Sequence, residues 1–414
     1  MTAPLPASSS VSRTAWLYVA LLMPVALLNY FDRQMLAAMK YSVMEGLPDI
    51  GSDANWGYML GQFKWVYAFL SPVGGYVADR FSRRWAICGS LFVWSAVTWW
   101  TGHVQSYNEL LWARSFMGIS EAFYIPAALA LISDYHRGPT RSRAIGLHQM
   151  AIYMGVIAGG FSGYVAEAPD LGWRFLFYFC GIFGMVYAVP LLWILRDAPI
   201  DESLPENIPQ RRSFFSTTFE LLRNPSFLLL VAYFTLPALA GWVVRDWMPA
   251  ILKERYNIGQ GLAGVSATLY WQTAAIFGAF FGGWLADRWV SKNIRGRIYV
   301  SAIGMAFIIP ALFGVGNAGT LGTAIAFLIL FGLGWGFFDC NNMPILCQIA
   351  RPELRATGYG IMNMVSISCG GLADWGFGVL KDANVGLNII FGAFASLALL
   401  SAFLVLAIRP KPEL

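Results

Sequence analysis

The stretch Gly75-Tyr-Val-Ala-Asp-Arg-Phe-Ser-Arg-Arg84 is a short charged segment that follows a long apolar run. Part of it returns in the second half of the chain as Gly283-x-x-x-Asp287-Arg288, an offset of 208 residues. A second repeat pairs Arg143-Ala-x-Gly146 with Arg355-Ala-x-Gly358 at an offset of 212 residues. Two matches at nearly equal offsets, each about half of the 414-residue chain, indicate that the chain is built from two similar halves.

The composition places these halves in a lipid bilayer. Hydrophobic residues make up 57% of the chain and charged residues 12%, whereas a soluble domain is about 25% charged. A helix needs roughly 20 apolar residues to cross a bilayer, so the chain has room for about twelve crossings. Apolar runs between charged or Gly/Pro-rich breaks predict spans at 16–38, 55–77, 85–102, 108–134, 142–167, 174–195, 226–252, 262–286, 297–315, 320–348, 356–381 and 386–408.

The predicted fold is an all-α membrane protein whose twelve transmembrane helices form two pseudo-symmetric bundles of six. The longest hydrophilic stretch, residues 196–224, is rich in proline and charge and lies between the sixth and seventh predicted spans. A segment of this composition is typical of a linker and not of a folded domain. We therefore predict an N-terminal bundle over 1–195, a cytoplasmic linker over 196–224 and a C-terminal bundle over 225–414.

The basic residues predict how the spans are oriented. They gather in alternate connections, at Arg13, Arg80, Arg83, Arg84, Arg137, Arg141, Arg143, Arg196, Arg211, Arg212, Arg223, Arg288, Lys292, Arg295, Arg297, Arg351, Arg355, Arg409 and Lys411. The first intervening loop carries Glu45, Asp49 and Asp53 instead, so the positive-inside rule places both termini in the cytoplasm. We expect a monomeric, multi-pass protein of the cell inner membrane.

Several classes of function are excluded by what the sequence lacks. The net charge of +5 follows from membrane orientation, and nucleic-acid binding would need a basic face on a soluble domain. The five cysteines fall inside predicted spans without metal-ligand spacing, which is typical of small packing residues. The sequence assembles no Ser/His/Asp set, metal cluster or Gly-rich phosphate loop. We therefore expect neither an enzyme nor a metalloprotein.

Several motifs resemble one family. Residues 75–84 resemble the cytoplasmic loop signature of the major facilitator superfamily, with Ser82 where a glycine is usual. The segments Asn29-Tyr-Phe-Asp-Arg33, Trp65-x-Tyr67 and Arg114-x-x-x-Gly-x-x-Glu-Ala122 resemble its anion:cation symporter branch, which includes bacterial sugar-acid transporters, and the related Spinster-like proteins. Residues 332–371 continue the resemblance into the second half. The resemblance implies a secondary transporter with its substrate near the midplane, between the two halves.

Ionisable side chains inside the predicted spans are the candidate functional residues, because each costs a few kcal/mol or more at bilayer depth. Asn29, Asp32 and Arg33 have i, i+3, i+4 spacing, which places them on one helix face. Arg114 and Glu121 lie two helical turns apart and share a face as well. A buried carboxylate binds a proton more readily, and a neighbouring arginine opposes this. An anion that engages the arginine would therefore allow proton uptake.

The family resemblance assigns roles to the same residues. In sugar-acid symporters the first-span arginine is a substrate ligand, the first-span aspartate and fourth-span glutamate take up protons, and the fourth-span arginine interacts with that glutamate. Carried over, this implies Asp32 and Glu121 as proton-coupling residues. It implies Arg33 and Arg114 as substrate-side residues, together with Asn29 on the same face. The alternative interpretation is that both sets are permanent ion pairs that lock helices together.

Lys64 is a further charge at membrane depth, one turn before Tyr67 on the second predicted span. It lies about 15 Å into that span, too deep for easy snorkelling to the interface. A cavity-facing ammonium there would favour a carboxylate, sulfonate or phosphate on the substrate, and we assign Lys64 and Tyr67 to substrate binding. The alternative role for Lys64 is structural packing.

Polar and aromatic side chains elsewhere in the spans complete the predicted substrate site. Amides and hydroxyls suit hydroxyl-bearing ligands, and aromatic faces suit sugar rings or acyl groups. The predicted substrate-binding residues are Gln149, Tyr153, Tyr270, Gln272, Asn341 and Asn363. Asp339 and Asp374 are departures from the family pattern, and each could bind a cation, assist proton transfer or pair with Arg245.

A last set of charges is assigned to gating. Arg245 and Asp246 lie near the outer end of the seventh predicted span and suggest an external gate. The loop charges of the two halves suggest cytoplasmic latches that break and reform between two conformations. These latch residues are Asp79, Arg80, Arg84, Asp287 and Arg288.

The sequence therefore predicts a secondary active transporter that carries a small organic anion, either a sugar acid or an acidic sugar, by proton-coupled symport and alternating access. The proton is the coupling ion, and no other cofactor is expected. The alternatives are a Spinster-like carrier of an amphipathic lipid anion and a non-coupled sugar facilitator. The partners expected are the small anionic solute and the lipid bilayer.

Overall fold

The computed structural model describes residues 13–80, 82–136, 140–198 and 214–410, without the side chains of 75–80, 142, 214, 215, 352 and 353. In these ranges the chain is helical and contains no β-strand. The helices are α1 (Arg13–Ala38), α2 (Lys40–Gly46), a 3-10 turn η1 (Pro48–Ile50), α3 (Asp53–Arg80), α4 (Arg83–Thr101), α5 (Tyr107–Glu121), α6 (Tyr124–Tyr135), α7 (Arg141–Gly160), α8 (Ser162–Glu167), α9 (Gly172–Ile194), α10 (Phe214–Leu222), α11 (Pro225–Tyr256), α12 (Gln260–Val290), α13 (Gly296–Asn317), α14 (Leu321–Asp339), α15 (Asn342–Ile349), α16 (Pro352–Asp382) and α17 (Leu387–Ala407). The all-α prediction is confirmed for the described residues.

Eight helical segments of the described chain are long and apolar enough to cross a membrane. They are Arg13–Ala38, Tyr107–Tyr135, Arg143–Glu167, Gly172–Ile194, Pro225–Tyr256, Gly296–Asn317, Leu321–Ile349 and Leu387–Ala407. Four more helices have 19 to 31 residues, namely α3, α4, α12 and α16. The number of crossings expected from the sequence remains a prediction.

Three spans expected as single helices are each divided in the structure. The segment 108–134 separates into α5 and α6 around Ala122, and 320–348 separates into α14 and α15 around Cys340. A proline lies four residues after each break, at Pro126 and Pro344. Because proline has no N–H and its ring crowds the carbonyl of residue i−4, it interrupts the helix at that turn. The third break, between α7 and α8, follows the pair Gly159-Gly160.

The predicted linker also contains structure. Its described end forms α10, which packs against α16 and α11 with Thr217 and Leu221 buried. Residues 199–213 of the linker lie outside the described part of the chain.

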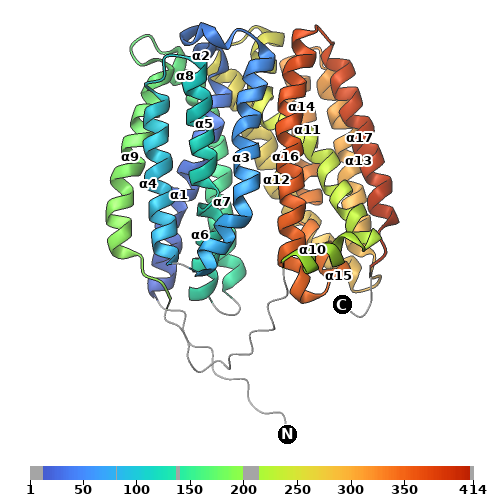
Figure 1. The fold of residues 1–414 in the computed structure, drawn as a ribbon. Helices are drawn as coiled ribbons and strands as arrows, with labels where there is room; N and C mark the ends of the chain where they lie inside the picture. Colours follow the sequence, from blue (N-terminus) through green and yellow to red (C-terminus); the bar gives the residue numbers. More distant parts are fainter. Residues whose placement is uncertain (1–12, 81, 137–139, 199–213, 411–414) are drawn as a thin grey trace.

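The two halves of the bundle meet along two pairs of helices. In Figure 1 the N-terminal helices and the C-terminal helices form neighbouring groups whose axes run roughly in the same direction. The halves are joined mainly by α3 against α16 and by α7 and α8 against α12. Small residues allow the close approach, because a Cβ at Gly160 of α7 would meet the backbone of Gly264 on α12.

Helix α1 begins and α17 ends at one end of the bundle, called the termini end, and α2 and α8 lie at the opposite end, called the α2 end (Figure 1). Bonds between the halves gather at the α2 end. The Glu167 carboxylate, on the last residue of α8, accepts from the backbone N–H of Gln260 at the start of α12, at 2.6 Å. Asp382, the last residue of α16, accepts from the N–H groups of Asp53 and Ala54 at the start of α3, at 3.0 and 2.8 Å.

These two contacts form a reciprocal arrangement. Each half supplies a carboxylate that caps a helix N-terminus of the other half, where unpaired N–H groups and the helix dipole favour negative charge. Lys40 and Lys381 both contact Asp53 nearby. Although burial raises the pKa of Asp53, these two ammonium groups hold it below its ordinary value. The α2 end is therefore closed by charged contacts.

Close helix packing inside the N-terminal half gives a first prediction. Gly155 of α7 faces α1, where an added Cβ would meet the backbone carbonyl of Leu27, whereas Gly146 of the same helix has open space. We expect Gly155→Ala to destabilise the protein by about 1–3 kcal/mol through overpacking. Thermal unfolding in detergent measures the effect, with Gly146→Ala as the matched control. Equal melting temperatures for the two variants would contradict this packing.

Candidate functional site

A cavity of about 460 Å³ lies between the two halves. Its wall carries nine aromatic rings, from Tyr30, Tyr67, Tyr153, Phe234, Trp242, Trp271, Trp335, Phe338 and Tyr359. Besides the hydroxyl groups of the tyrosines, its uncharged polar groups belong to Ser71, Gln149, Gln272, Asn363 and Ser366. The charged residues of its wall are Arg245 and Asp339. The cavity therefore combines a large apolar surface with a few polar groups, as ligand sites do.

Behind the aromatic wall lies a buried ion pair within the N-terminal half. Arg33 of α1 donates from Nε to Oε2 of Glu121 at 2.6 Å, and its Nη2 lies 2.6 Å from the same oxygen. The guanidinium also lies over the rings of Tyr30, Phe63 and Tyr67, at 4.8 to 4.9 Å from their centroids. Since Tyr30 and Tyr67 also line the cavity, two of the rings that contact the guanidinium belong to the cavity wall.

The other charges of this half lie near the pair. Arg114, expected to interact with Glu121, interacts with that carboxylate electrostatically, while its guanidinium lies over Phe63 at 4.5 Å and donates to the Met117 sulfur at 3.1 Å. The direct hydrogen bond to Glu121 comes from Arg33. Asp32 is buried and accepts from the Thr98 hydroxyl of α4 at 2.9 Å. Asn29 is fully buried one turn earlier on α1.

Lys64 lies outside the cavity lining and is already paired. Its ammonium contacts the Asp374 carboxylate of α16 and lies 2.5 Å from Oδ2 of Asp246 on α11. The Trp242 ring covers it at 4.2 Å. The structure thus brings Asp374 to Lys64 and not to Arg245, because α3 and α16 pack along each other. A role for Lys64 in substrate binding remains a prediction.

Arg245 is the cation that faces the cavity. The sequence suggested that it lies near the outer end of its span, but α11 continues to Tyr256 and places Arg245 in the cavity wall. Its guanidinium lies over Tyr30 at 5.0 Å and Trp242 at 5.7 Å, and its buried Nη2 makes no hydrogen bond. Among the described residues it forms no ion pair, whereas Arg33 and Lys64 both do. A gating role for Arg245 remains a prediction.

Most of the predicted polar ligands reach the cavity. Gln149, Tyr153, Gln272 and Asn363 all line it, as does Tyr67.

Two predicted ligands lie elsewhere. Tyr270 is 39% exposed on the outer side of α12, because successive residues of a helix point about 100° apart and its neighbours Trp271 and Gln272 face the cavity. Asn341 is buried at the break between α14 and α15, where it donates to the Phe337 carbonyl at 3.0 Å. This hydrogen bond satisfies a backbone carbonyl at the helix break, and Asn341 does not line the cavity.

The predicted latch residues make contacts within their own halves where the structure describes them. The side chains of Asp79 and Arg80 lie outside the described part of the chain. The backbone N–H of Arg84 donates to Asp197 at 3.0 Å. Asp287 lies 3.2 Å from Arg297, and Arg288 lies over the Trp284 ring at 5.7 Å. Their gating role remains a prediction.

Tyr30, Trp242 and Tyr359 are among the wall residues that were not predicted ligands, and their positions beside recognised polar residues are the signal that could have found them. Trp242 precedes Arg245 by three residues and Tyr359 precedes Asn363 by four, so each shares a face with a recognised polar residue. Tyr30 lies inside the first-span motif itself.

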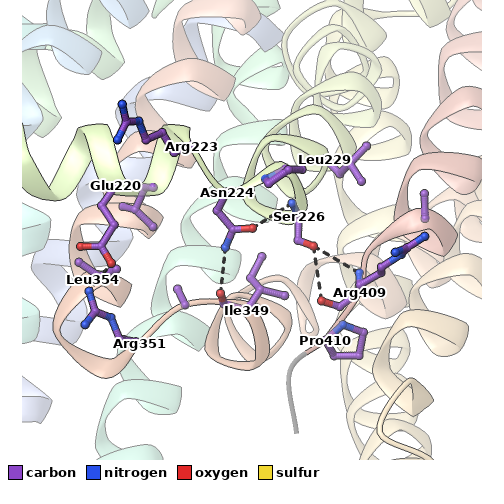
Figure 2. Close-up of a pocket in the computed structure, with 14 residues that line it drawn as sticks. Glu220, Arg223, Asn224, Ser226, Leu229, Ile349, Arg351, Leu354, Arg409 and Pro410 are labelled. Carbon is purple, nitrogen blue, oxygen red and sulfur yellow. Dashed lines mark hydrogen bonds and ion pairs between the residues drawn. The ribbon is translucent and has the colours of Figure 1, made fainter. Parts of the chain in front are cut away.

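A second and larger cavity, of about 1160 Å³, opens at the termini end of the C-terminal half. Figure 2 shows Glu220 beside Arg351 and Asn224 donating to the Ile349 carbonyl at 3.1 Å. All residues that line it come from 220–229, 349–354 and 407–410. A pocket inside one half is not opened and closed by motion between the halves, so it is not the alternating-access site.

Comparison with known proteins assigns the family. Residues 22–374 match the model of the Major Facilitator Superfamily. The chain belongs to this superfamily. Its members are transporters and not enzymes, so this protein is a multi-pass membrane transporter.

The major facilitator chain is also similar to Spinster proteins. Protein spinster of Drosophila melanogaster is 27% identical over 377 residues, which cover 87% of this chain and 61% of the fly protein. An MFS-type efflux pump of Mycolicibacterium smegmatis is 26% identical over 376 residues, covering 90% and 85%. The crystal structure of a bacterial homologue of the human lysosomal transporter Spinster, inward-facing and unoccupied, matches with a TM-score of 0.82 at 20% identity, covering 97% of this chain and all of that one. The expected resemblance to Spinster-like proteins is confirmed.

The buried Arg33–Glu121 pair gives a second prediction. Removing one partner leaves the other charge buried and unpaired, which costs about 3–5 kcal/mol. We expect Arg33→Gln to lower the melting temperature strongly and the double variant Arg33→Gln/Glu121→Gln to recover most of the loss. Thermal unfolding of both single variants and the double variant measures the coupling. Additive losses would show that the two side chains do not act as a pair.

Proposed function

We propose that this major facilitator protein carries an amphipathic organic anion by proton-coupled symport with alternating access. The observation that carries the proposal is the unpaired guanidinium of Arg245 in a cavity whose wall carries nine aromatic rings. A buried cation without a partner favours an anionic ligand, because the ligand supplies the missing charge. The aromatic wall supplies apolar contact for the rest of the molecule.

The cavity wall favours the Spinster-like alternative of the sequence analysis over a sugar acid. Nine aromatic rings line the cavity together with several aliphatic side chains, and four of the rings are tyrosines that also present a hydroxyl group. An apolar portion of the substrate still finds more contact than hydroxyl groups do. The amides of Gln149, Gln272 and Asn363 still offer hydrogen bonds to a sugar. A sugar acid therefore remains the second candidate.

Proton coupling is proposed to run through Glu121. The Tyr30 ring lies between two guanidinium groups, with Arg33 at 4.9 Å and Arg245 at 5.0 Å from its centroid. The negative charge of an anion held by Arg245 would offset part of the positive potential at Glu121, which Arg33 supplies and which stabilises the charged carboxylate. A buried carboxylate that loses this support binds a proton. Asp32, buried beside Thr98, is the second proposed coupling site.

The proposed orientation follows the positive-inside rule and puts the termini end in the cytoplasm. The contacts that close the α2 end would then lie on the outer side, and this conformation would be inward-facing. We place the protein in the cell inner membrane on the same grounds, as a monomer with twelve crossings.

The third prediction tests the cation in the cavity. Arg245→Ala removes the charge that the anion needs, so we expect uptake of an amphipathic anion into proteoliposomes to fall at least about tenfold in kcat/KM. The control is Arg255→Ala on the same helix, where Arg255 donates to the Gly316 carbonyl away from the cavity. A panel of lysolipids, uronates and neutral sugars identifies the class. Unchanged anion uptake in Arg245→Ala would overturn the proposal.

The fourth prediction tests coupling. With an inward-directed proton gradient, we expect the gradient to accelerate uptake in the parent protein and to have no effect in Glu121→Gln, which carries no titratable proton. Counterflow of labelled substrate without a gradient should persist in Glu121→Gln, because exchange needs no net proton movement. A Glu121→Gln variant that still concentrates substrate in response to the gradient would exclude Glu121 as the coupling site.

A further inference from the structure

A second cluster of buried charge lies outside the cavity and joins the two halves. Lys64 comes from α3 of the N-terminal half, whereas Asp246 and Asp374 come from α11 and α16 of the C-terminal half. The ammonium contacts both carboxylates, at 2.5 Å from Asp246 Oδ2. The side chains of Lys64, Asp246 and Asp374 are 4%, 11% and 0% exposed. We call these three residues the interface triad.

We infer that the interface triad is a proton-binding site, separate from Glu121, that takes up a proton when the α2 end closes. The inference does not depend on which substrate the protein carries.

The charges inside the triad do not balance. Two carboxylates share one ammonium, and the second oxygen of Asp374, Oδ1, is buried without a hydrogen-bond partner. A buried carboxylate oxygen without a donor is unfavourable, and two carboxylates that share a site favour holding one proton between them. A proton on Asp374 would leave one carboxylate for one ammonium and would remove the negative charge from the buried oxygen that has no donor.

The neighbouring cations do not cancel this excess by direct contact. Arg245 adjoins Asp246 in sequence, but its guanidinium lies over Tyr30 and Trp242 and forms no ion pair with either triad carboxylate. Arg114 on α5 lies over Phe63 and bonds to Met117. Arg33 on α1 is paired with Glu121. Each influences the triad only through space.

The position of the triad connects its proton to the motion of the halves. Separating the halves at the α2 end would pull α3 away from α11 and α16 and would admit water to the carboxylates, since both belong to the other half from Lys64. Solvated carboxylates bind protons less readily than buried ones. The closed state therefore binds the proton more tightly, and by linkage a lower pH favours closure of the α2 end.

The other acidic contacts at the α2 end predict the opposite pH dependence, in which a lower pH opens this end. Protonating Glu167 or Asp382 would weaken its cap on the other half, and protonating Asp53 would weaken its contact with Lys381 of the other half. Each of these changes favours opening at low pH. Lys40 remains charged below pH 7, because burial and the neighbouring Lys381 lower its pKa only to about 8. Closure on acidification is thus specific to the triad.

The fifth prediction measures closure directly. Glu45→Cys and Ala383→Cys place spin labels on exposed residues of the two halves at the α2 end, after replacement of the five native cysteines. Double electron–electron resonance measures the distance between the two labels, without substrate, from pH 5 to pH 7. The distance distribution gives the ratio of molecules with a closed α2 end to molecules with an open one. We expect this ratio to rise as the pH falls, by up to about tenfold per pH unit for one proton.

Two triad variants separate a proton site from a purely structural contact. Asp374→Asn leaves one carboxylate with one ammonium, and the ratio should change less than about twofold over this pH range. Lys64→Gln leaves two carboxylates without a cation, so its α2 end should open near pH 7 and close again near pH 5. The inference would be overturned if the closed-to-open ratio of Asp374→Asn depended on pH as strongly as that of the parent protein. It would also be overturned if the ratio of Lys64→Gln did not change with pH.

Glu121→Gln distinguishes this site from the proposed function. It should keep the parental slope, because the triad is intact, even though transport is uncoupled. Loss of the slope in Glu121→Gln would assign the proton to Glu121 and reject the triad. Loss of gradient-driven uptake with an unchanged slope would support both sites separately.

Discussion

Charged side chains at bilayer depth must be neutralised by partners from other helices, because leaving one unpaired costs about 3 kcal/mol or more. In this protein the rule places Arg33 against Glu121 within one half, and Lys64 against Asp246 and Asp374 across the two halves. Each pairing fixes which helices must be neighbours. The positions of α1, α3, α5, α11 and α16 around the cavity follow from these pairings and from the close packing of glycines.

Two cations depart from this rule in the described part of the chain, because Arg114 and Arg245 form no ion pair, and of these two only Arg245 lines the cavity. It lies in the same region as the paired charges, and yet its guanidinium is held by the faces of Tyr30 and Trp242 and by no carboxylate. An aromatic face stabilises a cation only partly. A charge left in this state is the natural contact for an anion, and the Tyr30 ring places it next to the Arg33–Glu121 pair. In the proposed mechanism, one aromatic side chain therefore lies between the substrate site and the proton site.

Two sets of charged contacts, the carboxylate caps and the interface triad, join the halves on the side of the α2 end. At the α2 end, Glu167 and Asp382 each cap a helix of the opposite half, so closure is symmetric between the halves. Below them the interface triad joins α3 to α11 and α16. When the α2 end closes, the charged groups of both sets leave water and contact the other half. The stability of the closed state therefore depends on the charge of these groups. Their responses to acid have opposite signs, since the caps lose a contact and the triad loses an excess charge.

The sequence by itself determined the helical class, the two similar halves, the family resemblance and most of the charged residues that matter. Hydrophobic length and repeated motifs are local properties, so they can be read along the chain. Even the breaks at Ala122 and Cys340 follow from Pro126 and Pro344, although they were not predicted. Only the tertiary structure decided which charge faces which. Lys64 and Arg245 are both single cations within apolar runs, but α16 brings Asp374 to Lys64 and leaves Arg245 facing the cavity. Pairing depends on contacts between residues up to 310 positions apart, and no local pattern encodes such contacts.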